Sequence, residues 1–409
     1  MKILFLSADS NGNYPIPAVK GGAVSTLVEY FLDNNQELDL ASLSVVSYYD
    51  EMARKKAENY NNTDFIWIKI PSIINLFDKF MFNFIKLFFK NEKAVSFKSI
   101  FSLLYYISKS KKIIKENEFD YIIIENNIPL SMVFKKSLPS AKIVYHLHNV
   151  PRINVNNLNF FRNVNYYLCV SRFVADTINS EQSVIGKIKK NKIKLLYNTI
   201  DCDKFKPLMY SKNVRKIKRA EYGLNEEDFV LIFVGRLTEE KGALELLKAM
   251  KLLPKKVKAL IVGSYHYNSN VNTKYQENLK NEASQLGNRI VFTGYIQHDL
   301  LPQFYNIADI AVLPSIWDEP AGLTNLEAMA CGTPIITTDV GGIPEYVGQS
   351  VVLSKNDDLI NGIATEVEKF MSDSNYLQRM REYSVNYVKL NFNKNDYLIN
   401  LIKILNSED

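Results

Sequence analysis

Residues 229–253 read FVLIFVGRLTEEKGALELLKAMKLL, which is a strand pattern, a turn and a helical pattern in that order. The first six residues, Phe229–Val234, are all apolar, as is typical of a strand that is buried on both faces of a sheet. Gly235 follows and permits a sharp turn of the backbone, and apolar residues then recur at helical spacing over 243–253. The stretch therefore predicts a strand–turn–helix unit of a parallel α/β sheet.

The same alternation of apolar strands and helical patterns recurs in both halves of the chain. The expected strands are Lys2–Ser7, Tyr121–Glu125, Lys142–His146 and Tyr167–Ser171 in the first half, and Phe229–Val234, Ala259–Val262, Ile290–Phe292, Ile310–Leu313 and Ile335–Thr338 in the second. Strands of this kind separated by helices indicate parallel sheets with helices on both faces. We therefore predict an α/β fold of two Rossmann-like, doubly wound domains that face a cleft.

The length of the chain also favours two domains, since 409 residues are too many for one hydrophobic core. The stretch 195–207 combines the end of a strand with Asn, Asp and Pro, which mark a turn. We place the boundary there, with one domain at 1–200, a second at 201–385 and a terminal helix at 386–409. Asp201-Cys202-Asp203 in this linker is formally a metal-binding D-x-D, but no third ligand lies nearby in the sequence.

Composition excludes several classes of protein. A formal net charge of +6 is too small for a dedicated nucleic-acid binder. Three scattered cysteines, Cys169, Cys202 and Cys331, argue for a reducing compartment and against a disulfide framework or a zinc site. The apolar start, residues 1–7, is too short for a signal peptide, and no apolar run approaches the roughly 18 residues of a membrane span. We therefore expect a cytoplasmic protein.

A second informative stretch, residues 318–334, reads DEPAGLTNLEAMACGTP and carries Glu319 and Glu327 eight positions apart. It predicts a helix that begins near Gly322 and ends before the Gly and Pro at its far end. The amides of residues 322–324 would then be unpaired donors at the positive end of the helix, which suits a phosphate. A nucleotide-sugar, with a phosphate between two hydroxyl-bearing groups, fits these features. The alternative is an ordinary surface helix with a solvated glutamate.

Two cations follow the strand with which the first stretch begins. Arg236 and Lys241 lie beyond Gly235 at the carboxyl end of that strand, the edge at which open α/β sheets bind ligands. A leaving diphosphate gains negative charge as its bond breaks, so fixed cations at this edge would stabilise the transition state. The alternative is that both are solvated surface charges beside two glutamates.

The order of these motifs resembles that of family 4 of the retaining glycosyltransferases, group 1 enzymes with the GT-B fold. The motifs that carry the resemblance in the second half are Gly235-Arg236…Lys241-Gly242, Phe292-Thr293-Gly294-Tyr295, Ala308-Asp309…Pro314-Ser315 and Glu319-Pro320…Glu327-Ala328-Met329-Ala330…Gly332-Thr333-Pro334. Those in the first half are Gly21-Gly22, Leu147-His148-Asn149, Val170-Ser171-Arg172 and Tyr197-Asn198-Thr199-Ile200-Asp201. The resemblance covers the second half strongly and the first half more thinly.

The resemblance implies a role for each matching residue. The implied catalytic residues are Glu319, which holds a sugar hydroxyl near the reacting carbon, His148 under the donor sugar, and Arg236 and Lys241, which grip the diphosphate. The implied donor-binding residues are Gly21, Gly22, Gly235, Gly294, Tyr295, Ile296, Gly322, Leu323, Thr324 and Glu327, the last of which accepts ribose hydroxyls. It also implies that 1–200 binds the acceptor, that 201–385 binds the donor and that helix 386–409 packs back on the first domain.

The implied chemistry needs neither a metal nor a cofactor. The acceptor hydroxyl attacks the face that the diphosphate leaves, with retention of configuration. Two positions depart from the family pattern: Thr199 stands where glycine is usual, and Thr is poor at positive φ, and Ala321 stands where an aromatic residue is common. The second departure leaves the identity of the donor sugar open.

The histidines carry separate expectations. His146 and His148 lie on one expected strand, and we expect their side chains to face opposite sides, so that one of them is an ordinary core histidine. His266 and His298 match no motif and are interpreted as loop residues. Paired glutamates also occur in hydrolases, but Glu319 and Glu327 are both placed to serve one helix end.

The segment 73–106 has a composition suited to a membrane surface. Its large apolar residues Phe77, Phe80, Met81, Phe84, Leu87 and Phe88 are interleaved with Lys79, Lys86, Lys90 and Lys93. Basic residues beside large apolar ones at helical spacing are what an interfacial helix requires. The alternative is a helix whose aromatic face packs inside the first domain.

The leading hypothesis is a retaining glycosyltransferase that moves a sugar from a nucleotide-diphosphate donor, with a UDP-sugar favoured, to a hydroxyl of a glycan or lipid-linked acceptor. It would act in bacterial surface-glycan synthesis, in the cytoplasm or peripherally on the inner face of the membrane, and without nucleic acid. One alternative is a non-catalytic coat component that only binds a nucleotide-sugar. A phosphorylase would need a cofactor-binding lysine, which no segment indicates.

Overall fold

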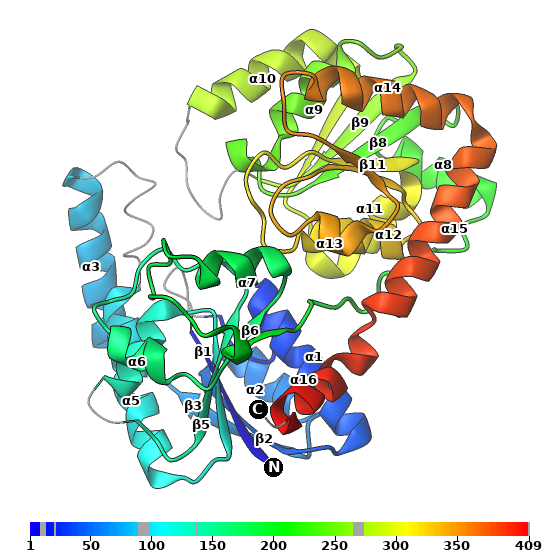
Figure 1. The fold of residues 1–409 in the computed structure, drawn as a ribbon. Coiled ribbons are helices and arrows are strands. Elements are labelled where there is room, and N and C mark those ends of the chain that lie inside the picture. The colour runs from blue at the N-terminus through cyan, green and yellow to red at the C-terminus, as the bar shows by residue number, and fades with distance from the viewer. Residues whose placement is uncertain (9–13, 20–21, 89–98, 136–137, 265–273, 408–409) are drawn as a thin grey trace. The chain divides into compact units, whose positions relative to one another are not determined.

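The computed structural model describes the whole chain except residues 9–13, 20–21, 89–98, 136–137, 265–273 and 408–409 (Figure 1). The chain divides into two compact units. The first comprises Met1–Asn198 together with the segment from Lys394 onward, and the second comprises Thr199–Asn393. The sequence pattern placed the start of the terminal segment at residue 386. In the structure, helix α15, Ser374–Asn391, continues past that residue, and the segment that belongs to the first unit begins at Lys394.

The first unit is a parallel seven-stranded sheet in the order β3-β2-β1-β4-β5-β6-β7. Its strands are β1 Lys2–Ser7, β2 Ser42–Tyr48, β3 Thr63–Ile68, β4 Tyr121–Glu125, β5 Lys142–Leu147, β6 Tyr166–Cys169 and β7 Ile193–Leu195. Register is continuous across its centre, where Phe5 pairs with Val45 on one side and with Ile123 on the other. Strands β2 and β3 are additional to those expected, because their apolar runs are interrupted by polar residues, and β7 is the strand whose end was expected near residue 195.

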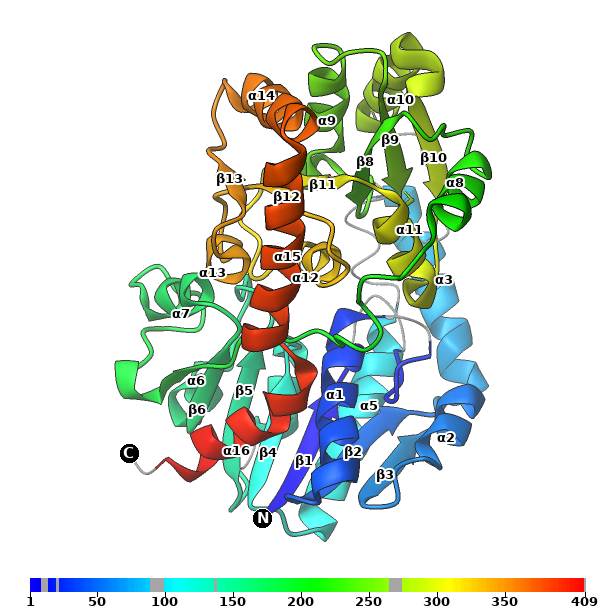
Figure 2. The same cartoon turned by 90° about the vertical axis from the view of Figure 1, so that its right-hand side faces the viewer.

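The helices of the first unit are α1 Ala23–Leu38, α2 Glu51–Ala57, α3 Ser72–Phe88, α5 Ile100–Glu116, α6 Leu158–Asn163, α7 Arg172–Asn179 and α16 Tyr397–Asn406, with short 3-10 turns at η2 Ile128–Phe134, η3 Lys190–Lys192 and η7 Lys394–Asp396. Helix α16 packs beside α1 on one face of the sheet (Figure 2). The rings of Phe31 and Tyr397 stack there with centroids 4.2 Å apart. Lys394 binds Asp33 of α1 at 2.9 Å. The end of the chain is thereby part of the first unit.

The second unit is a parallel six-stranded sheet in the order β10-β9-β8-β11-β12-β13. The strands are β8 Phe229–Val234, β9 Val257–Val262, β10 Ile290–Gly294, β11 Ile310–Leu313, β12 Ile335–Thr338 and β13 Val351–Leu353. The helices are α8 Lys212–Ala220, α9 Ala243–Met250, α10 Lys274–Leu286, α11 Leu301–Ile307, α12 Leu323–Ala330, α13 Pro344–Val347, α14 Leu359–Ser372 and α15, with 3-10 turns η4 Glu239–Lys241, η5 Gly287–Arg289 and η6 His298–Leu300. The predicted pair of doubly wound parallel-sheet domains is confirmed.

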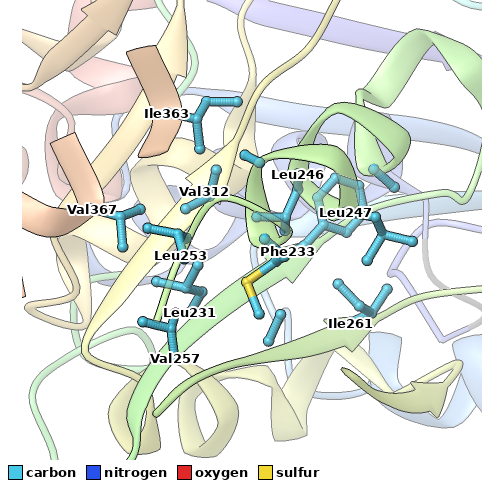
Figure 3. Packing of buried hydrophobic residues seen from close by; sticks show 14 of the residues in the cluster. Leu231, Phe233, Leu246, Leu247, Leu253, Val257, Ile261, Val312, Ile363 and Val367 are labelled. Atoms are coloured by element: carbon cyan, nitrogen blue, oxygen red, sulfur yellow. The ribbon is translucent and has the colours of Figure 1, made fainter. Parts of the chain in front are cut away.

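The core of the second unit lies between the sheet and the helices α9 and α14 (Figure 3). Every residue of β8 is buried, as its unbroken apolar sequence predicts. Leu246 and Leu247 of α9 and Ile363 and Val367 of α14 contact this face and are fully buried. Burial of such side chains stabilises the fold by roughly 1.5–3 kcal/mol each.

Asp309 anchors several elements of the second unit from the loop before β11. Its Oδ2 accepts hydrogen bonds from the guanidinium of Arg219 and from the amide of Val230, both at 2.8 Å. Its Oδ1 accepts from Arg215 at 2.8 Å, and Arg381 of α15 lies 3.4 Å from the same oxygen. The Ala308-Asp309 motif is therefore a structural link between α8, β8 and α15.

Replacement of this carboxylate is expected to destabilise the second unit strongly. Asp309→Ala would leave the buried guanidinium of Arg219 without its counter-charge, and broken buried ion pairs cost about 3–5 kcal/mol. Arg215→Ala, which removes a more exposed partner, should cost about 1 kcal/mol or less. Urea unfolding of both variants measures the difference, and equal losses would contradict the anchoring role of Asp309.

Candidate functional site

The loop after β8 brings two cations to the carboxyl edge of the second sheet. Arg236 is exposed, with a guanidinium nitrogen 3.6 Å from Glu240, and Lys241 ends the turn η4. Gly242 follows at φ +73°, and a Cβ there would lie 1.8 Å from the carbonyl oxygen of Pro314. Only glycine permits this approach of two backbones, and it holds Lys241 against the loop that follows β11.

Glu319 lies on that second loop and meets Lys241 directly. Its Oε1 is 2.5 Å from the Nζ of Lys241 and accepts a hydrogen bond from the Ser315 hydroxyl, also at 2.5 Å. The carboxylate is only 6% exposed. Burial of a charge is costly unless it is paired and hydrogen-bonded, so these two partners hold Glu319 in one position at the sheet edge.

The segment 340–342 contacts the backbone of Glu319. This contact was not predicted from the sequence. The amide of Gly342 donates to the carbonyl oxygen of Glu319 at 2.7 Å. Gly341 has φ +59°, and a Cβ there would come within 2.2 Å of the same oxygen. A pair of glycines after a buried strand was the available signal, because glycines in such positions often mark a close backbone approach.

Helix α12 begins at Leu323, directly after Gly322 at φ +76°, as the sequence predicts. No side chain caps this end of the helix. The residues Gly322, Leu323 and Thr324 are all partly exposed. Unpaired amides and the positive end of the helix dipole therefore face outward here, which suits an anion.

Glu327 lies one turn into α12 and is also held by two partners. Its Oε2 accepts a hydrogen bond from the Tyr305 hydroxyl at 3.0 Å, and its Oε1 is 2.8 Å from the Nε2 of His298. The carboxylate is 5% exposed. Burial, together with the charge of Glu327, raises the pKa of Tyr305 well above its ordinary value, so its hydroxyl remains a donor.

The interpretation of His298 as a plain loop residue was incomplete. The ammonium of Lys204 lies 3.2 Å from the Nδ1 of His298 and binds Asp299. An ammonium only donates, so Nδ1 accepts and Nε2 carries the hydrogen that Glu327 accepts. No local pattern revealed this contact, since 29 residues separate His298 from Glu327.

The residues expected to contact a base lie at the start of the loop between β10 and η6, which leads to His298. Gly294 closes β10 at φ +73°, Tyr295 is half exposed and Ile296 is partly exposed. His298 follows two residues later in η6. The second unit therefore places the segments 235–241, 294–296 and 319–327, which were expected to bind the donor, on loops and a helix start at one sheet edge.

The first unit holds the remaining predicted residues. Gly22 precedes α1 at φ +105°, and Gly21 lies outside the described residues. His148 follows β5. The side-chain oxygen of Asn126 accepts a hydrogen bond from the backbone amide of His148 at 3.1 Å. Thr199, the departure from the Asn-Gly pattern, opens the second unit and is not among the residues with positive φ.

The expectation that His146 and His148 face opposite sides is wrong. Side chains alternate along a strand, so residues two apart face the same side. Their rings lie 4.1 Å apart, and both contact the buried carboxylate of Glu125 on β4. Sequence reasoning missed Glu125 because it ends an ordinary apolar strand, and its role depends on the pairing of β4 with β5.

Burial and hydrogen bonding set the charges of this cluster. Burial alone would raise the pKa of Glu125, but the charge of His146 and the hydrogen bonds of both histidines lower it to about 2. Burial and repulsion by His146 lower the pKa of His148 to about 4, against the opposing effect of Glu125 and Asn198. At neutral pH, Glu125 is therefore ionised and His148 is neutral.

The donor atoms of Glu125, His146 and His148 lie within 4.8 Å of one another, a spacing that also suits a divalent metal. The absence of a metal therefore stays a prediction. Asp201 of the D-x-D pattern stabilises the turn in which it lies. Its side chain accepts hydrogen bonds from the amides of Asp203 and Lys204 at 2.9 and 3.0 Å.

Comparison with known proteins shows what this chain is similar to. Residues 214–386 match the family model of glycosyl transferases group 1. The protein named "Putative glycosyltransferase YtcC" of Bacillus subtilis (strain 168) is 29% identical over 293 residues, which cover 68% of this chain and 70% of that protein. Spore coat protein SA of the same organism is 26% identical over 307 residues, 71% of this chain and 79% of that protein.

Solved structures show the same fold. The crystal structure of HepE from Anabaena, in complex with UDP and glucose, superposes with a TM-score of 0.72 at 20% identity, and the match covers 100% of both chains. The fold is therefore GT-B, as the resemblance implied. The family model matches less than half of the chain, and the two relatives are less than 30% identical to it, so these comparisons show what the chain is similar to.

Acid is expected to destabilise the first unit through the histidine–glutamate cluster. His148 has a folded pKa of about 4, below the roughly 6.5 of an unfolded histidine, so unfolding takes up a proton between these values. The free energy of unfolding therefore falls as pH drops from 6.5 to 4, by up to about 1.4 kcal/mol per pH unit. Glu125, with a folded pKa of about 2, extends the loss below pH 4.5.

His148→Asn should flatten the dependence between pH 6.5 and 4, whereas His298→Asn, in the other unit, should not flatten it for the first unit. Urea unfolding followed by hydrogen exchange of first-unit amides at several pH values measures this slope. An unchanged slope in the His148 variant would show that the histidine is not buried in its neutral form.

Proposed function

We propose that this chain is a group 1 glycosyltransferase that moves a sugar from a nucleotide-diphosphate-sugar to a hydroxyl acceptor. The observation that carries the proposal is the contact of Lys241 with Glu319 beside the open N-terminus of α12. This arrangement puts a fixed cation, a carboxylate and free backbone amides at one sheet edge. A diphosphate joined to a polyhydroxyl group requires these three kinds of partner.

Different residues of the proposed donor site bind the diphosphate, the sugar, the ribose and the base. Arg236 and Lys241 supply positive charge for the diphosphate, and the first amides of α12 bind its distal phosphate and the sugar. Glu327, whose oxygens keep free lone pairs beside Tyr305 and His298, accepts the ribose hydroxyls. Tyr295 and Ile296 contact the base. We favour a uridine diphosphate donor, since the HepE structure of the same fold contains UDP and glucose.

The proposed reaction proceeds with retention and needs no metal or cofactor. The acceptor oxygen forms a bond to the anomeric carbon on the face from which the diphosphate departs. The bond between that carbon and the phosphate oxygen breaks, and the acceptor proton passes to the departing oxygen. Lys241 and Arg236 stabilise the charge that develops on the diphosphate, while Glu319 orients the sugar through a hydroxyl.

A non-catalytic role in a coat is the second candidate, and the similarity to spore coat protein SA favours it. The fold and the binding of a nucleotide-sugar would be retained in such a protein without transfer. The paired Lys241 and Glu319 argue for catalysis, because a protein that only binds does not need groups placed beside the bond that breaks.

We further propose that the first unit contacts an anionic membrane surface on the cytoplasmic side of a bacterial membrane. There it would bind a glycan or lipid-linked acceptor. Ile73, Leu76, Phe77, Phe80 and Phe84 form an exposed stripe on α3, each at least 50% exposed. None of the described helices is long and apolar enough to cross a bilayer, so this stripe suits contact with a surface.

Hydrogen bonds of Asp78, on the buried face of α3, fix the orientation of the exposed stripe. Asp78 of α3 is buried and accepts the amides of Phe101 and Ser102 at 2.8 and 3.1 Å, at the start of α5. The one acidic side chain of α3 is thus turned inward, while Lys79 is exposed. Lys86, Lys90 and Lys93 follow in the sequence, at positions whose side chains lie outside the described residues.

Two substitutions test the donor site. Lys241→Ala and Glu319→Gln are each expected to lower the rate of transfer by roughly 10²–10³-fold, because each removes a group that acts on charge or orientation in the transition state. Transfer from a panel of UDP-sugars to acceptor glycans is the measurement. Lys255→Ala, an exposed lysine away from this edge, is the matched control and should keep the wild-type rate.

If both site variants transfer sugar at the wild-type rate, these residues do not form the site. If the wild-type protein binds UDP-sugars by calorimetry but neither transfers nor hydrolyses them, the non-catalytic candidate is favoured. Donor binding at a hundredfold excess over Kd should stabilise the protein by about 2.7 kcal/mol, which a thermal-shift screen detects.

The membrane surface has its own test. The double variant Phe77→Ser, Phe80→Ser should lose most of its sedimentation with phosphatidylglycerol vesicles, since it removes two of the most exposed aromatic rings of the stripe. Met52→Ser replaces an equally exposed apolar side chain on α2 and should bind as the wild type does. Wild-type protein that fails to sediment with anionic vesicles would refute a membrane role for α3.

A further inference from the structure

A lysine in the segment that opens the second unit contacts His298. The unit begins at Thr199, and Lys204 follows in a turn where its amide donates to the side chain of Asp201 at 3.0 Å. Its ammonium lies 3.2 Å from the Nδ1 of His298 and forms an ion pair with Asp299. The side chain of Lys204 is 29% exposed, so most of it is covered by protein. The opening segment of the unit is therefore tied to the turn that carries His298.

The ring of His298 is also held on its other sides. The fully buried ring of Phe205, the residue after Lys204, lies 5.1 Å from the ring of His298 between centroids. The Nε2 of His298 lies 2.8 Å from the Oε1 of Glu327. Lys204, His298 and Glu327 thus form a chain of three groups, each within hydrogen-bond distance of the next, that ends at the carboxylate on α12.

This chain of groups determines how Glu327 presents its oxygens. An ammonium can only donate, so the Nδ1 of His298 accepts and its Nε2 keeps the hydrogen that points at Oε1. The Tyr305 hydroxyl donates to Oε2 at 3.0 Å. Because a carboxylate oxygen has two lone pairs, one on each oxygen remains for a ligand. The two donors, one on each oxygen, therefore fix the direction in which Glu327 presents its remaining acceptors.

We propose that Lys204 is a positioning residue that acts through His298 and fixes Glu327 for the hydroxyls of the donor's ribose. The inference rests on the proposed glycosyl transfer and deepens it, because it makes a residue of the opening segment a determinant of donor specificity. Without Lys204, the ring of His298 is free to turn a lone pair toward Glu327, and two facing acceptors repel each other. The carboxylate then loses the direction that suits two neighbouring hydroxyls, while the contacts of the diphosphate are unchanged.

The state of His298 can be measured without any nucleotide. The chain has four histidines, so nitrogen-15 NMR of the labelled imidazoles gives few signals, and His298→Leu identifies those of His298. At pH 8.5, where an ordinary imidazole is neutral, the full-length protein should show a protonated Nε2 and an Nδ1 that accepts a hydrogen bond. In Lys204→Met, the Nδ1 signal should move to the position of a nitrogen with a free lone pair. Lys206→Met, at an exposed lysine two residues further on, should leave the signal unchanged.

A pair of nucleotides tests the effect on ribose recognition. UDP and 2′,3′-dideoxy-UDP differ only in the two hydroxyls, and calorimetry gives the Kd of each; if UDP does not bind, ADP, GDP and CDP with their dideoxy forms take its place. The wild type should bind UDP about 10–100-fold more tightly, because hydrogen bonds to a charged group are strong.

The variants of Lys204 should change this preference in a graded way. Lys204→Met should reduce it by about tenfold through weaker binding of UDP, and the Kd of the dideoxy form should stay within about twofold. Lys204→Arg keeps a charged donor and should restore most of the preference. Lys206→Met is the matched control and should retain all of it.

A double-mutant cycle shows whether Lys204 acts through His298. His298→Leu removes both ring nitrogens, so it should lower the preference for UDP as Lys204→Met does. In the His298→Leu protein, the second change at Lys204 should then alter the preference by no more than about twofold. A purely structural role for Lys204 would instead make the two losses multiply, and it would weaken the binding of both nucleotides alike.

Three results would overturn the inference: a wild-type His298 protonated at Nδ1, a Lys204→Met protein with the wild-type preference, and losses that multiply in the cycle. A wild type that transfers sugar but does not prefer the ribose hydroxyls would also refute it and leave the proposed transfer intact. A preference that depends on Lys204, in a protein that never transfers sugar, would refute transfer and support the inference. A wild type that binds none of UDP, ADP, GDP and CDP would refute both.

Discussion

Both units depend on the burial of their central strands, such as β8, which is apolar along its whole length. Such strands must be covered on both faces, which requires helical crossovers and makes the sheets parallel. In a parallel sheet, all strands end at the same edge. Consequently the turns after β8, β10 and β11 lie at one edge of the second sheet, where Lys241 and Glu319, which are far apart in the sequence, meet.

Close backbone contacts make this edge rigid. Gly242 packs against Pro314, Gly263 against Gly235 and Gly341 against Glu319, each so tightly that a Cβ would lie within 2.2 Å of a backbone oxygen. Glycines of this kind are often interpreted as openings for a phosphate. Here these glycines bring protein loops together, and the loops in turn carry Lys241 and Glu319 at fixed positions.

The three carboxylates of the candidate sites share one physical solution. Glu319 is held by Lys241 and Ser315, Glu327 by His298 and Tyr305, and Glu125 by His146 and His148. Each is almost fully buried, and each burial cost is offset by two partners. Groups that are held in this way lose little entropy when a ligand binds, which is the advantage of a preorganised site.

The sequence alone determined the elements with local signals. The unbroken run of β8, the start of α12 after Gly322 and the order of the family motifs are properties of neighbouring residues, and periodicity or turn chemistry reports them. The tertiary structure alone decided which side chains meet. His298 and Glu327, Glu125 and His148, and Asp309 with its arginines are contacts between separate elements. They depend on strand order and register, which a local pattern does not contain.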